Sequence, residues 1–235
     1  MTDQAEARAQ SLPATPSGAM LRTLGGVAAI AGFLVVLAYQ ITLPMIEENQ
    51  RIAIEKAIFQ VVPGAVTRQD FRLAPSGLTV GSEGVGEHVY AAYDKAGQLK
   101  GVALQGAAQG YQDVIKLLYG FDPSCRCITG IKVLKMTETP GLGDKIAKDA
   151  AFQANFDALD ASLNSAGDGL EHPVVTVKHG TKQNPWEIDA ISGATISSNA
   201  VGRALNESAQ RIVPLIMANL AELESPRSDA GGTTD

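Results

Sequence analysis

One stretch near the N-terminus constrains this chain more than any other feature of its sequence. No charged residue occurs between Thr23 and Ile46, and the segment from Leu24 to Tyr39 is apolar on all sides. A helix needs roughly 20 apolar residues to cross the hydrocarbon core of a bilayer, so the stretch predicts a transmembrane helix over residues 20–46. Two alternatives stay open. A cleaved signal peptide would have a shorter apolar region with a small-residue cleavage site, and a buried core helix rarely lacks polar residues for so long.

The charges that flank this stretch bear on its orientation. Arg8 and Arg22 precede it, and Arg51 and Lys56 follow it, so the positive residues are nearly balanced between the two sides. Because Arg22 lies at the edge of the span and the N-terminal tail is short, we expect a cytoplasmic N-terminus. We therefore expect residues 1–19 to be a disordered cytoplasmic tail. The chain is then a single-pass protein of the bacterial inner membrane whose main domain lies on the periplasmic side.

The remaining composition suits one globular domain with no nucleic-acid partner. The chain has 235 residues, of which 45% are hydrophobic, enough to bury a core beyond the anchor. A net charge of −6 argues against binding to phosphate backbones, which requires a basic face. The two cysteines and three scattered histidines predict no metal site. We expect this domain over residues 47–223 and a flexible tail over 224–235.

Hydrophobic patterning along the domain predicts strands in the middle and helices at the ends. An α+β class follows, with a mainly antiparallel sheet and packed helices, because the strands and helices are segregated along the chain. The expected helices are 46–62, 149–164 and 197–223, the last one interrupted by Pro214. The expected strands are the hairpin 88–93 and 99–104, the pair 114–119 and 128–134 joined by residues 120–127, and 174–177.

The segment from Asp189 to Ser198 carries the first chemical signal. Small residues, Gly193 and Ala194, precede Thr195 and let a bulky ligand approach the backbone. A helix is expected to begin just after Thr195, and the free N–H groups and dipole of a helix N-terminus stabilise a phosphate. These features together suit a phosphate ester on Thr195. The alternative is that Thr195 is an ordinary helix N-cap.

A second signal is the run Glu138-Thr-Pro-Gly-Leu-Gly143, which predicts a tight turn after a strand. Gly141 and Gly143 leave room for a flat ring, and Leu142 is placed to pack against its face. Tyr111, in the Gly-Tyr pair that precedes the strand expected over 114–119, either lines the same site or belongs to the core. An ordinary strand–helix connection is the alternative for the whole run.

The two runs together resemble a known family. Ser192-Gly-Ala-Thr195, with Asp189 upstream and Ser197 downstream, is similar to the flavinylation motif of the FMN-binding domain family, in which a flavin transferase joins the phosphate of FMN to the motif threonine. Glu138 to Gly143 resembles a segment of the G subunit of the Rnf electron-transport complex, and the likeness extends over about residues 20–220. The cofactor-binding residues that the resemblance implies are Thr195, which carries the covalent FMN, with Ser192, Gly193, Ala194, Glu138, Thr139, Gly141, Leu142, Gly143 and Tyr111.

The function implied by the resemblance is electron transport within a membrane complex. The chain would be a non-autonomous redox subunit, without catalytic residues of its own, whose FMN relays electrons one at a time. Such a complex transfers electrons between ferredoxin and NAD and couples this transfer to ion translocation. The other membrane subunits of the complex would be the partners of this chain. Two alternatives are the C subunit of the related sodium-translocating NADH:quinone reductase and a membrane-tethered binding module without flavin.

The pair Cys125-x-Cys127 stands outside this resemblance. A redox pair, or a contribution to a metal cluster shared with a neighbouring subunit, is one interpretation. We favour incidental thiols on a surface turn, because two cysteines are too few to hold a cluster within one chain.

Overall fold

The fold is described from a computed structural model, which defines residues 17–75, 77–81 and 84–225. The chain divides into two compact units, Met1–Gln50 and Arg51–Asp235, which are described separately. The predicted tails, 1–19 and 224–235, lie almost entirely outside the described residues.

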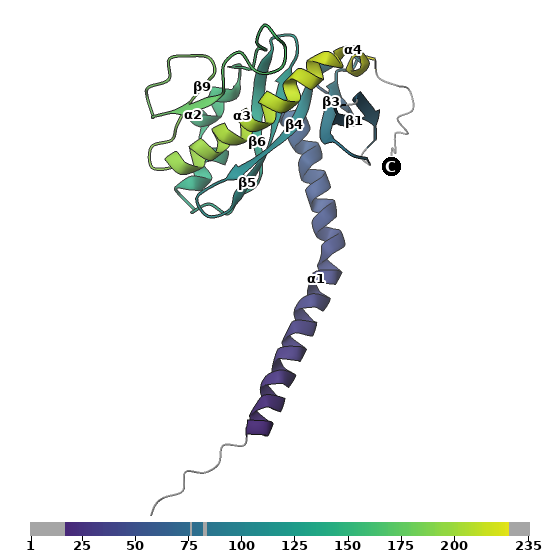
Figure 1. Cartoon of the computed structure of the whole chain (residues 1–235), viewed down its shortest axis with the longest axis vertical. Helices are drawn as coiled ribbons and strands as arrows, with labels where there is room; N and C mark the ends of the chain where they lie inside the picture. The colour runs from purple at the N-terminus through teal and green to yellow at the C-terminus, as the bar shows by residue number, and fades with distance from the viewer. Residues whose placement is uncertain (1–16, 76, 82–83, 226–235) are drawn as a thin grey trace, which may run out of the picture. The chain divides into compact units, whose positions relative to one another are not determined.

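Helix α1 (Ser17–Val61) contains the predicted anchor and the helix expected after it (Figure 1). Within the described part of the chain it is the one helix long and apolar enough to cross a membrane. No part of its apolar window is buried, so the core-helix alternative is wrong. Pro44 lies inside the helix. The helix ends at Val61, shortly before Pro63 and Gly64.

The second unit is built on a seven-stranded antiparallel sheet, which confirms the predicted α+β class. The strand order is β2-β1-β3-β4-β5-β6-β7, and a separate parallel pair joins β8 to β9. The strands are β1 (Thr67–Ala74), β2 (Gly77–Val80), β3 (Glu87–Tyr93), β4 (Leu99–Gln109), β5 (Val114–Asp122), β6 (Cys127–Lys135), β7 (Leu159–Asp160), β8 (Val175–Val177) and β9 (Glu187–Asp189). Both predicted strand pairs, β3 with β4 and β5 with β6, are present.

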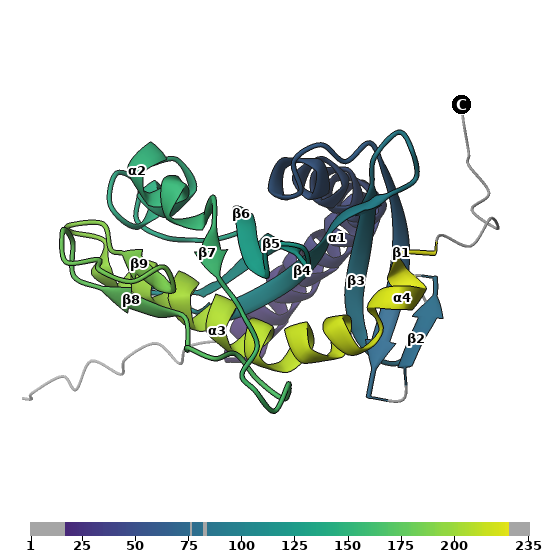
Figure 2. The ribbon, with the colours of Figure 1, turned by 90° about the horizontal axis from the view of Figure 1, so that it is seen from above.

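Helix α3 (Thr195–Ala218) covers one face of this sheet, as Figure 2 shows, and is followed by the short α4 (Leu220–Leu223). The main hydrophobic core lies between α3 and the sheet, where Val201, Leu205 and Ile212 of the helix are buried with strand residues. The helix approaches β4 closely because Gly106 has no side chain: a Cβ there would lie 2.7 Å from the carbonyl oxygen of Ala204. This contact allows α3 to lie close to β4 at Ala204.

The other face of the sheet is covered by the C-terminal end of α1, which belongs to the second unit. Ala57, Ile58 and Val61 form a second core with side chains of β3, β4 and β5. Thr129 on β6 donates a hydrogen bond of 2.6 Å to the carbonyl oxygen of Val61, one of the groups that a helix leaves free at its end. The sheet is therefore buried on both faces.

The predicted helix over 149–164 is wrong beyond its first turns. The chain forms the short α2 (Ala150–Gln153) and a 3-10 turn, η2 (Ala154–Phe156), and then enters β7. Leu159 has the helical spacing from Phe152 and Phe156, but it pairs with Ile128 on β6. Tertiary pairing with the edge of the sheet has overridden the local pattern. Strands β1, β2 and β9 were not individually predicted, and the last long helix ends at Ala218 instead of residue 223.

Candidate functional site

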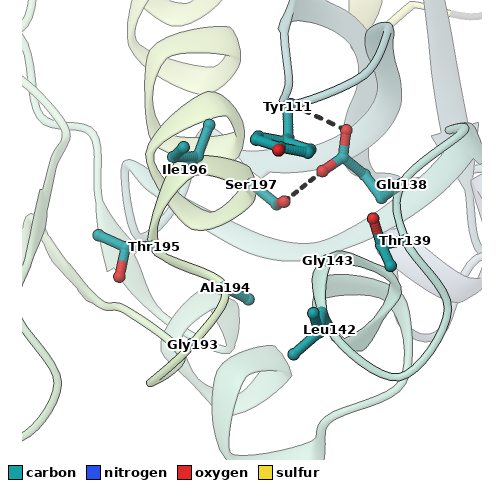
Figure 3. A pocket seen from close by; sticks show the side chains of 10 residues that line it. All are labelled: Tyr111, Glu138, Thr139, Leu142, Gly143, Gly193, Ala194, Thr195, Ile196 and Ser197. Carbon is teal, nitrogen blue, oxygen red and sulfur yellow. Dashed lines mark hydrogen bonds between the residues drawn. The ribbon is translucent and has the colours of Figure 1, made fainter.

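A pocket of about 370 Å³ opens where three parts of the second unit meet (Figure 3). These parts are the connection between β4 and β5, the connection that follows β6, and the first turn of α3. The volume lies within the range of small-molecule sites. The lining residues are Tyr111, Glu138, Thr139, Leu142, Gly143, Gly193, Ala194, Thr195, Ile196 and Ser197.

The carboxylate of Glu138 ties the three parts together at the buried side of the pocket. Glu138 is only 6% exposed. Its Oε1 accepts hydrogen bonds from the backbone N–H groups of Tyr111 (2.9 Å) and Gln112 (3.3 Å). Its Oε2 accepts the hydroxyl hydrogen of Ser197 (Figure 3). One side chain therefore sets the distance between the loop of Tyr111 and the start of α3.

Two glycines make space for this carboxylate. A Cβ on Gly110 would lie 2.5 Å from Oε1 of Glu138, and one on Gly143 would lie 2.7 Å from both Oε2 of Glu138 and Oγ of Ser197. Real Cβ atoms do not approach other atoms this closely, so any larger residue would displace the carboxylate. The position that a Cβ would take on Gly143 is thus filled by Glu138 and Ser197, while Gly143 itself lines the pocket.

The turn that carries Leu142 is built as the sequence predicts. The backbone N–H of Leu142 donates to the carbonyl oxygen of Thr139 at 3.1 Å, and Gly141 has a φ of 79°, a conformation that glycine adopts readily. Oδ1 of Asp144 accepts the N–H of Gly141 at 2.6 Å. The hydrogen bond from Lys148 Nζ, 3.0 Å from Oδ2, and that from Gly141 hold the pKa of Asp144 below its usual value. The 3-10 helix η1 (Gly143–Ala147) begins one residue after Leu142.

Thr195 is the first residue of α3, not its N-cap. The N-cap is Ala194, and no side chain caps this end of the helix, so the alternative of an ordinary capping threonine is wrong. Instead Ser198 closes the preceding turn: its Oγ accepts the N–H of Ile191 at 3.1 Å and donates to the carbonyl oxygen of Ala194 at 3.0 Å. Thr195 is exposed, and its side chain points away from the Glu138–Ser197 pair at the outer edge of the pocket (Figure 3).

The first turn of α3 has the character of an anion site. Its first intrahelical hydrogen bond runs from the N–H of Ser198 to the carbonyl oxygen of Ala194, at 2.9 Å. The helical pattern leaves the preceding N–H groups, from Thr195 to Ser197, without an acceptor inside the helix. No acidic residue of α3 itself lies in this turn, and the one carboxylate beside it, that of Glu138, accepts the hydroxyl of Ser197.

The rim of the pocket is apolar on three sides. Tyr111, Leu142 and Ile196 belong to three different segments and are 65%, 50% and 52% exposed. Large apolar side chains that remain exposed around a pocket are typical of a binding site. Next to an anion-favouring helix start, they suit a ligand with a flat aromatic ring and a phosphate arm. The residues present therefore fit FMN.

The structure brings together most of the predicted site residues, with two exceptions and two additions. Ser192 and Gly141 do not line the pocket, because the first precedes the turn at Gly193 and the second shapes the turn behind Leu142. Ile196 and Ser197 line it but were not predicted as site residues. A helix that begins at Thr195 carries both residues in its first turn. The expected start of this helix near Thr195 was therefore the sequence signal that could have identified them. Within the described residues, no group of three histidine, cysteine or acidic side chains could hold a metal.

Asp189, which precedes the Ser192–Thr195 motif, does not line the pocket. Its Oδ1 accepts the N–H of Gly180 at 2.6 Å, and its Oδ2 lies 3.4 Å from Nδ1 of His179. The side-chain oxygen of Asn155 accepts the N–H of Asp189 at 3.0 Å. Asp189 therefore braces the loops beneath the start of α3 and contributes no side chain to the pocket.

Comparisons with known proteins converge on one family. The FMN-binding domain matches residues 110–210. The chain is 31% identical over 185 residues to the G subunit of an ion-translocating oxidoreductase complex of Methanosarcina acetivorans, covering 78% of this chain and 88% of that protein. It is 30% identical over 192 residues to the G subunit of the Na(+)-translocating ferredoxin:NAD(+) oxidoreductase complex of Acetobacterium woodii, covering 78% of this chain and 86% of that protein.

Solved structures show the same fold at lower identity. NqrC of Shewanella oneidensis has a TM-score of 0.55 at 17% identity, and the match covers 74% of this chain and 99% of that one. The C subunit of the Na(+)-translocating NADH-quinone reductase of Parabacteroides distasonis has a TM-score of 0.56 at 21% identity, covering 77% and 96%.

Proposed function

Since this chain belongs to the family formed by the G subunits of ion-translocating oxidoreductase complexes, we propose that it is a membrane-anchored electron carrier with FMN joined through its phosphate to Thr195. One observation carries the covalent attachment: an exposed threonine hydroxyl lies at the uncapped start of α3, on the edge of a pocket with an apolar rim. When bound, FMN supplies the electron-transfer chemistry, and the protein supplies attachment, orientation and electrostatics.

The residues around the pocket have separate roles in this proposal. The free N–H groups of the first turn of α3 stabilise the phosphate beside Thr195. Tyr111, Leu142 and Ile196 contact the flavin ring and exclude water from its faces. Glu138 holds Ser197 and the loop of Tyr111 in place beneath it.

Attachment requires a maturation partner. A threonine hydroxyl does not displace water from a phosphate at neutral pH, so we expect a flavin transferase that uses an activated donor, an anhydride of FMN with a second phosphate. The bond between Thr195 Oγ1 and phosphorus forms as the anhydride bond breaks, the second phosphate group leaves, and the hydroxyl proton is released. The exposure of Thr195 supports this step, because a second protein must reach its side chain.

For the whole complex we propose electron relay between ferredoxin and NAD coupled to ion translocation, as the name of the Acetobacterium woodii relative states for that protein. Helix α1 would hold the carrier in the bacterial inner membrane beside its partner subunits. The periplasmic placement of the second unit is supported by the disulfide between Cys125 and Cys127, because disulfides persist in oxidising compartments.

A second candidate is the C subunit of a sodium-translocating NADH:quinone reductase, which the fold of the solved neighbours favours. The relatives with 30% and 31% identity are instead G subunits. Purification of the intact complex distinguishes the two candidates: ferredoxin-dependent NAD reduction supports the first, and NADH-dependent quinone reduction supports the second.

The covalent bond is tested by substitution of Thr195. The full chain, expressed with a flavin transferase, should give a band that stays fluorescent on a denaturing gel, with a mass increased by FMN less one water. Thr195→Ala should remove both signals, because no acceptor hydroxyl remains at the start of α3. A fluorescent band of unchanged intensity in Thr195→Ala would exclude this attachment site.

A matched control is available within the same pocket. Thr139→Ala removes the other threonine hydroxyl that lines it, and the fluorescent band should persist. A colourless wild-type protein, prepared beside a flavinylated reference protein, would instead support the binding module without flavin.

A further inference from the structure

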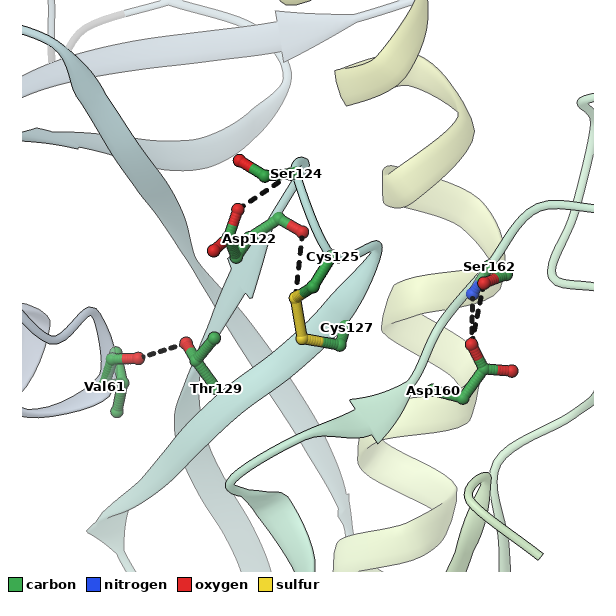
Figure 4. The surroundings of a disulfide bond; sticks show 8 residues. All are labelled: Val61, Asp122, Ser124, Cys125, Cys127, Thr129, Asp160 and Ser162. Atoms are coloured by element: carbon green, nitrogen blue, oxygen red, sulfur yellow. Dashed lines mark hydrogen bonds between the residues drawn. A yellow bond between two sulfur atoms is a disulfide. The ribbon is translucent and has the colours of Figure 1, made fainter.

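The two cysteines form a disulfide at the end of the hairpin that joins β5 to β6 (Figure 4). The expectation of incidental thiols is therefore wrong. The bridge spans a single intervening residue, Arg126, and the Cα atoms of Cys125 and Cys127 lie 5.2 Å apart. It belongs to neither the pocket nor its three segments, so its chemistry is independent of the proposed flavin.

The hairpin is held in place without this bridge. Asp122 pairs with Cys127 in the sheet, and Oδ1 of Asp122 accepts the N–H of Ser124 at 2.7 Å. On its other side Cys127 pairs with Asp160 of β7, and the carbonyl oxygen of Arg126 accepts the N–H of Ala161 at 3.0 Å. A disulfide stabilises mainly by closing a long loop in the unfolded chain, and this loop is among the shortest possible. A structural role accounts poorly for the bond.

The surroundings of the bond favour chemistry. Cys125 is exposed, whereas Cys127 is only 7% exposed. Arg126 has a φ of 55° and is the one residue other than glycine with a positive φ in the described part of the chain. Such a conformation is sparsely populated by residues other than glycine and is found in turns and at functional sites. Arg126 is exposed and covalently adjacent to both cysteines, and a neighbouring cation favours the thiolate form.

We propose that Cys125–Cys127 is a thiol–disulfide exchange site whose substrate is a protein dithiol. A thiolate of the dithiol attacks Sγ of Cys125, which is the accessible residue. A mixed disulfide forms as the bond to Cys127 breaks, and Cys127 leaves as a thiolate. The second thiol of the partner then attacks the mixed disulfide, so the partner is oxidised to its own disulfide. The pair in this chain gains two electrons and two protons and becomes a dithiol.

The short separation explains why a dithiol is the substrate and not a monothiol. After the first attack the released Cys127 stays next to the mixed disulfide and reverses the reaction. A monothiol must meet the site a second time to compete, whereas the second thiol of a dithiol is already present at high effective concentration. The site therefore discriminates between the two classes by the number of thiols.

The test uses the full flavinylated chain in detergent, with dithiothreitol and glutathione as probes. Aliquots are quenched with an alkylating agent, and the modified cysteines are counted by mass spectrometry. We expect dithiothreitol to reduce the bond in the folded protein with an unchanged near-ultraviolet circular dichroism spectrum. The excess of glutathione needed for the same reduction should be at least tenfold larger than the excess needed for a linear reference peptide whose bridged cysteines lie further apart. Reduction that occurs only as the protein unfolds would overturn the proposal. Equal efficiency of the two probes would overturn the assignment to dithiols.

Two single variants test the order of attack. In Cys127→Ser the exposed Cys125 remains, and it should react with glutathione disulfide at least tenfold faster than the buried Cys127 does in Cys125→Ser. The double variant Cys125→Ser/Cys127→Ser should melt within a few degrees of the wild-type protein. Equal reaction rates would contradict the attack on Cys125, and a double variant that fails to fold would show that the bond is structural.

Discussion

At the scale of single residues, the buried carboxylate of Glu138 joins the loop of Tyr111 to the start of α3. Replacing it by alanine leaves the N–H groups of Tyr111 and Gln112 and the hydroxyl of Ser197 without their acceptor. Of these three residues Ser197 is buried, and an unsatisfied buried polar group costs about 2 kcal/mol. Glu138→Ala should therefore lower the free energy of unfolding by about this amount, measured by urea unfolding followed through the fluorescence of Trp186.

Glu138→Gln is the matched control for this prediction. The glutamine side chain keeps a carbonyl oxygen for the two backbone N–H groups and offers its own N–H to Oγ of Ser197. It should retain most of the stability that alanine loses. If both variants unfold at the same urea concentration, the hydrogen bonds of Glu138 do not determine the geometry of this site.

Buried tyrosines give a prediction for alkaline pH. Burial raises the pKa of Tyr93 to about 12 and also raises that of Tyr119, whose hydroxyl donates to Oγ of Ser208 at 2.9 Å. A raised folded-state pKa means that the neutral ring stabilises the fold fully below the unfolded value of about 10. This contribution is lost as the pH rises through the folded value.

Two of the five tyrosines should therefore ionise only as the protein unfolds. The measurement is a titration of tyrosinate absorbance beside the far-ultraviolet circular dichroism signal, on Thr195→Ala protein to avoid flavin absorbance. Ionisation of Tyr93 and Tyr119 near pH 10 with the helical signal intact would contradict their burial.

Sequence reasoning at this scale located the pocket but not its internal contacts. The small residues before Thr195 and the turn at Gly141 have local signatures, and both turns are present in the structure. The contact between Glu138 and Ser197 joins positions 59 residues apart. No local pattern encodes it, because it depends on the placement of α3 above the sheet. The sequence offered a redox pair at Cys125 and Cys127 only as the less favoured interpretation, because the disulfide depends on the hairpin geometry that brings the Cα atoms together.

At the scale of elements, the seating of the C-terminal end of α1 on the sheet depends on one glycine. A Cβ on Gly120 would overlap the carbonyl oxygen of Val61, the same atom that accepts the hydrogen bond of Thr129. Overpacking of this kind costs about 2 kcal/mol, so Gly120→Ala should lower the free energy of unfolding by about that amount. Thermal unfolding followed by circular dichroism measures the effect.

Gly130 lies nearby and serves as the control. A Cβ there would lie 3.5 Å from Cα of Val61, an ordinary van der Waals contact. Gly130→Ala should change the free energy of unfolding by no more than about 0.5 kcal/mol, as most tolerated substitutions do. Equal losses in the two variants would mean that strand propensity, and not contact with the helix, sets the requirement for glycine.

The elements that were predicted correctly are those whose pattern and packing agree. The pairs β3–β4 and β5–β6 have apolar runs bounded by turns, and their neighbours in the sheet are also their neighbours in the chain. The helix expected over 149–164 is wrong from Leu159 onward, because Leu159 pairs with the edge of the sheet. Strand β9 has only three residues, too few to show a periodicity, and it pairs with β8, which lies outside the main sheet.

At the scale of the whole molecule, the disulfide predicts which side of the membrane carries the second unit. An alkaline phosphatase fused after residue 235 folds to an active form only in an oxidising compartment. We expect it to be active in intact bacteria, because the Cys125–Cys127 disulfide requires similar conditions. A fluorescent protein that matures only in the cytoplasm is the complementary fusion. Fluorescence from that fusion without phosphatase activity would reverse the orientation.

The long separation between the segments of the pocket determines when a ligand can be attached. Tyr111 and Glu138 leave the ribosome well before Thr195, which lies in the last long helix of the described chain. During synthesis and export, therefore, the nascent polypeptide offers a modifying enzyme only an unstructured threonine among many others. Recognition of the folded surface around Thr195 becomes available only after every strand of the sheet and α3 have emerged, so the proposed attachment would follow the folding of the second unit.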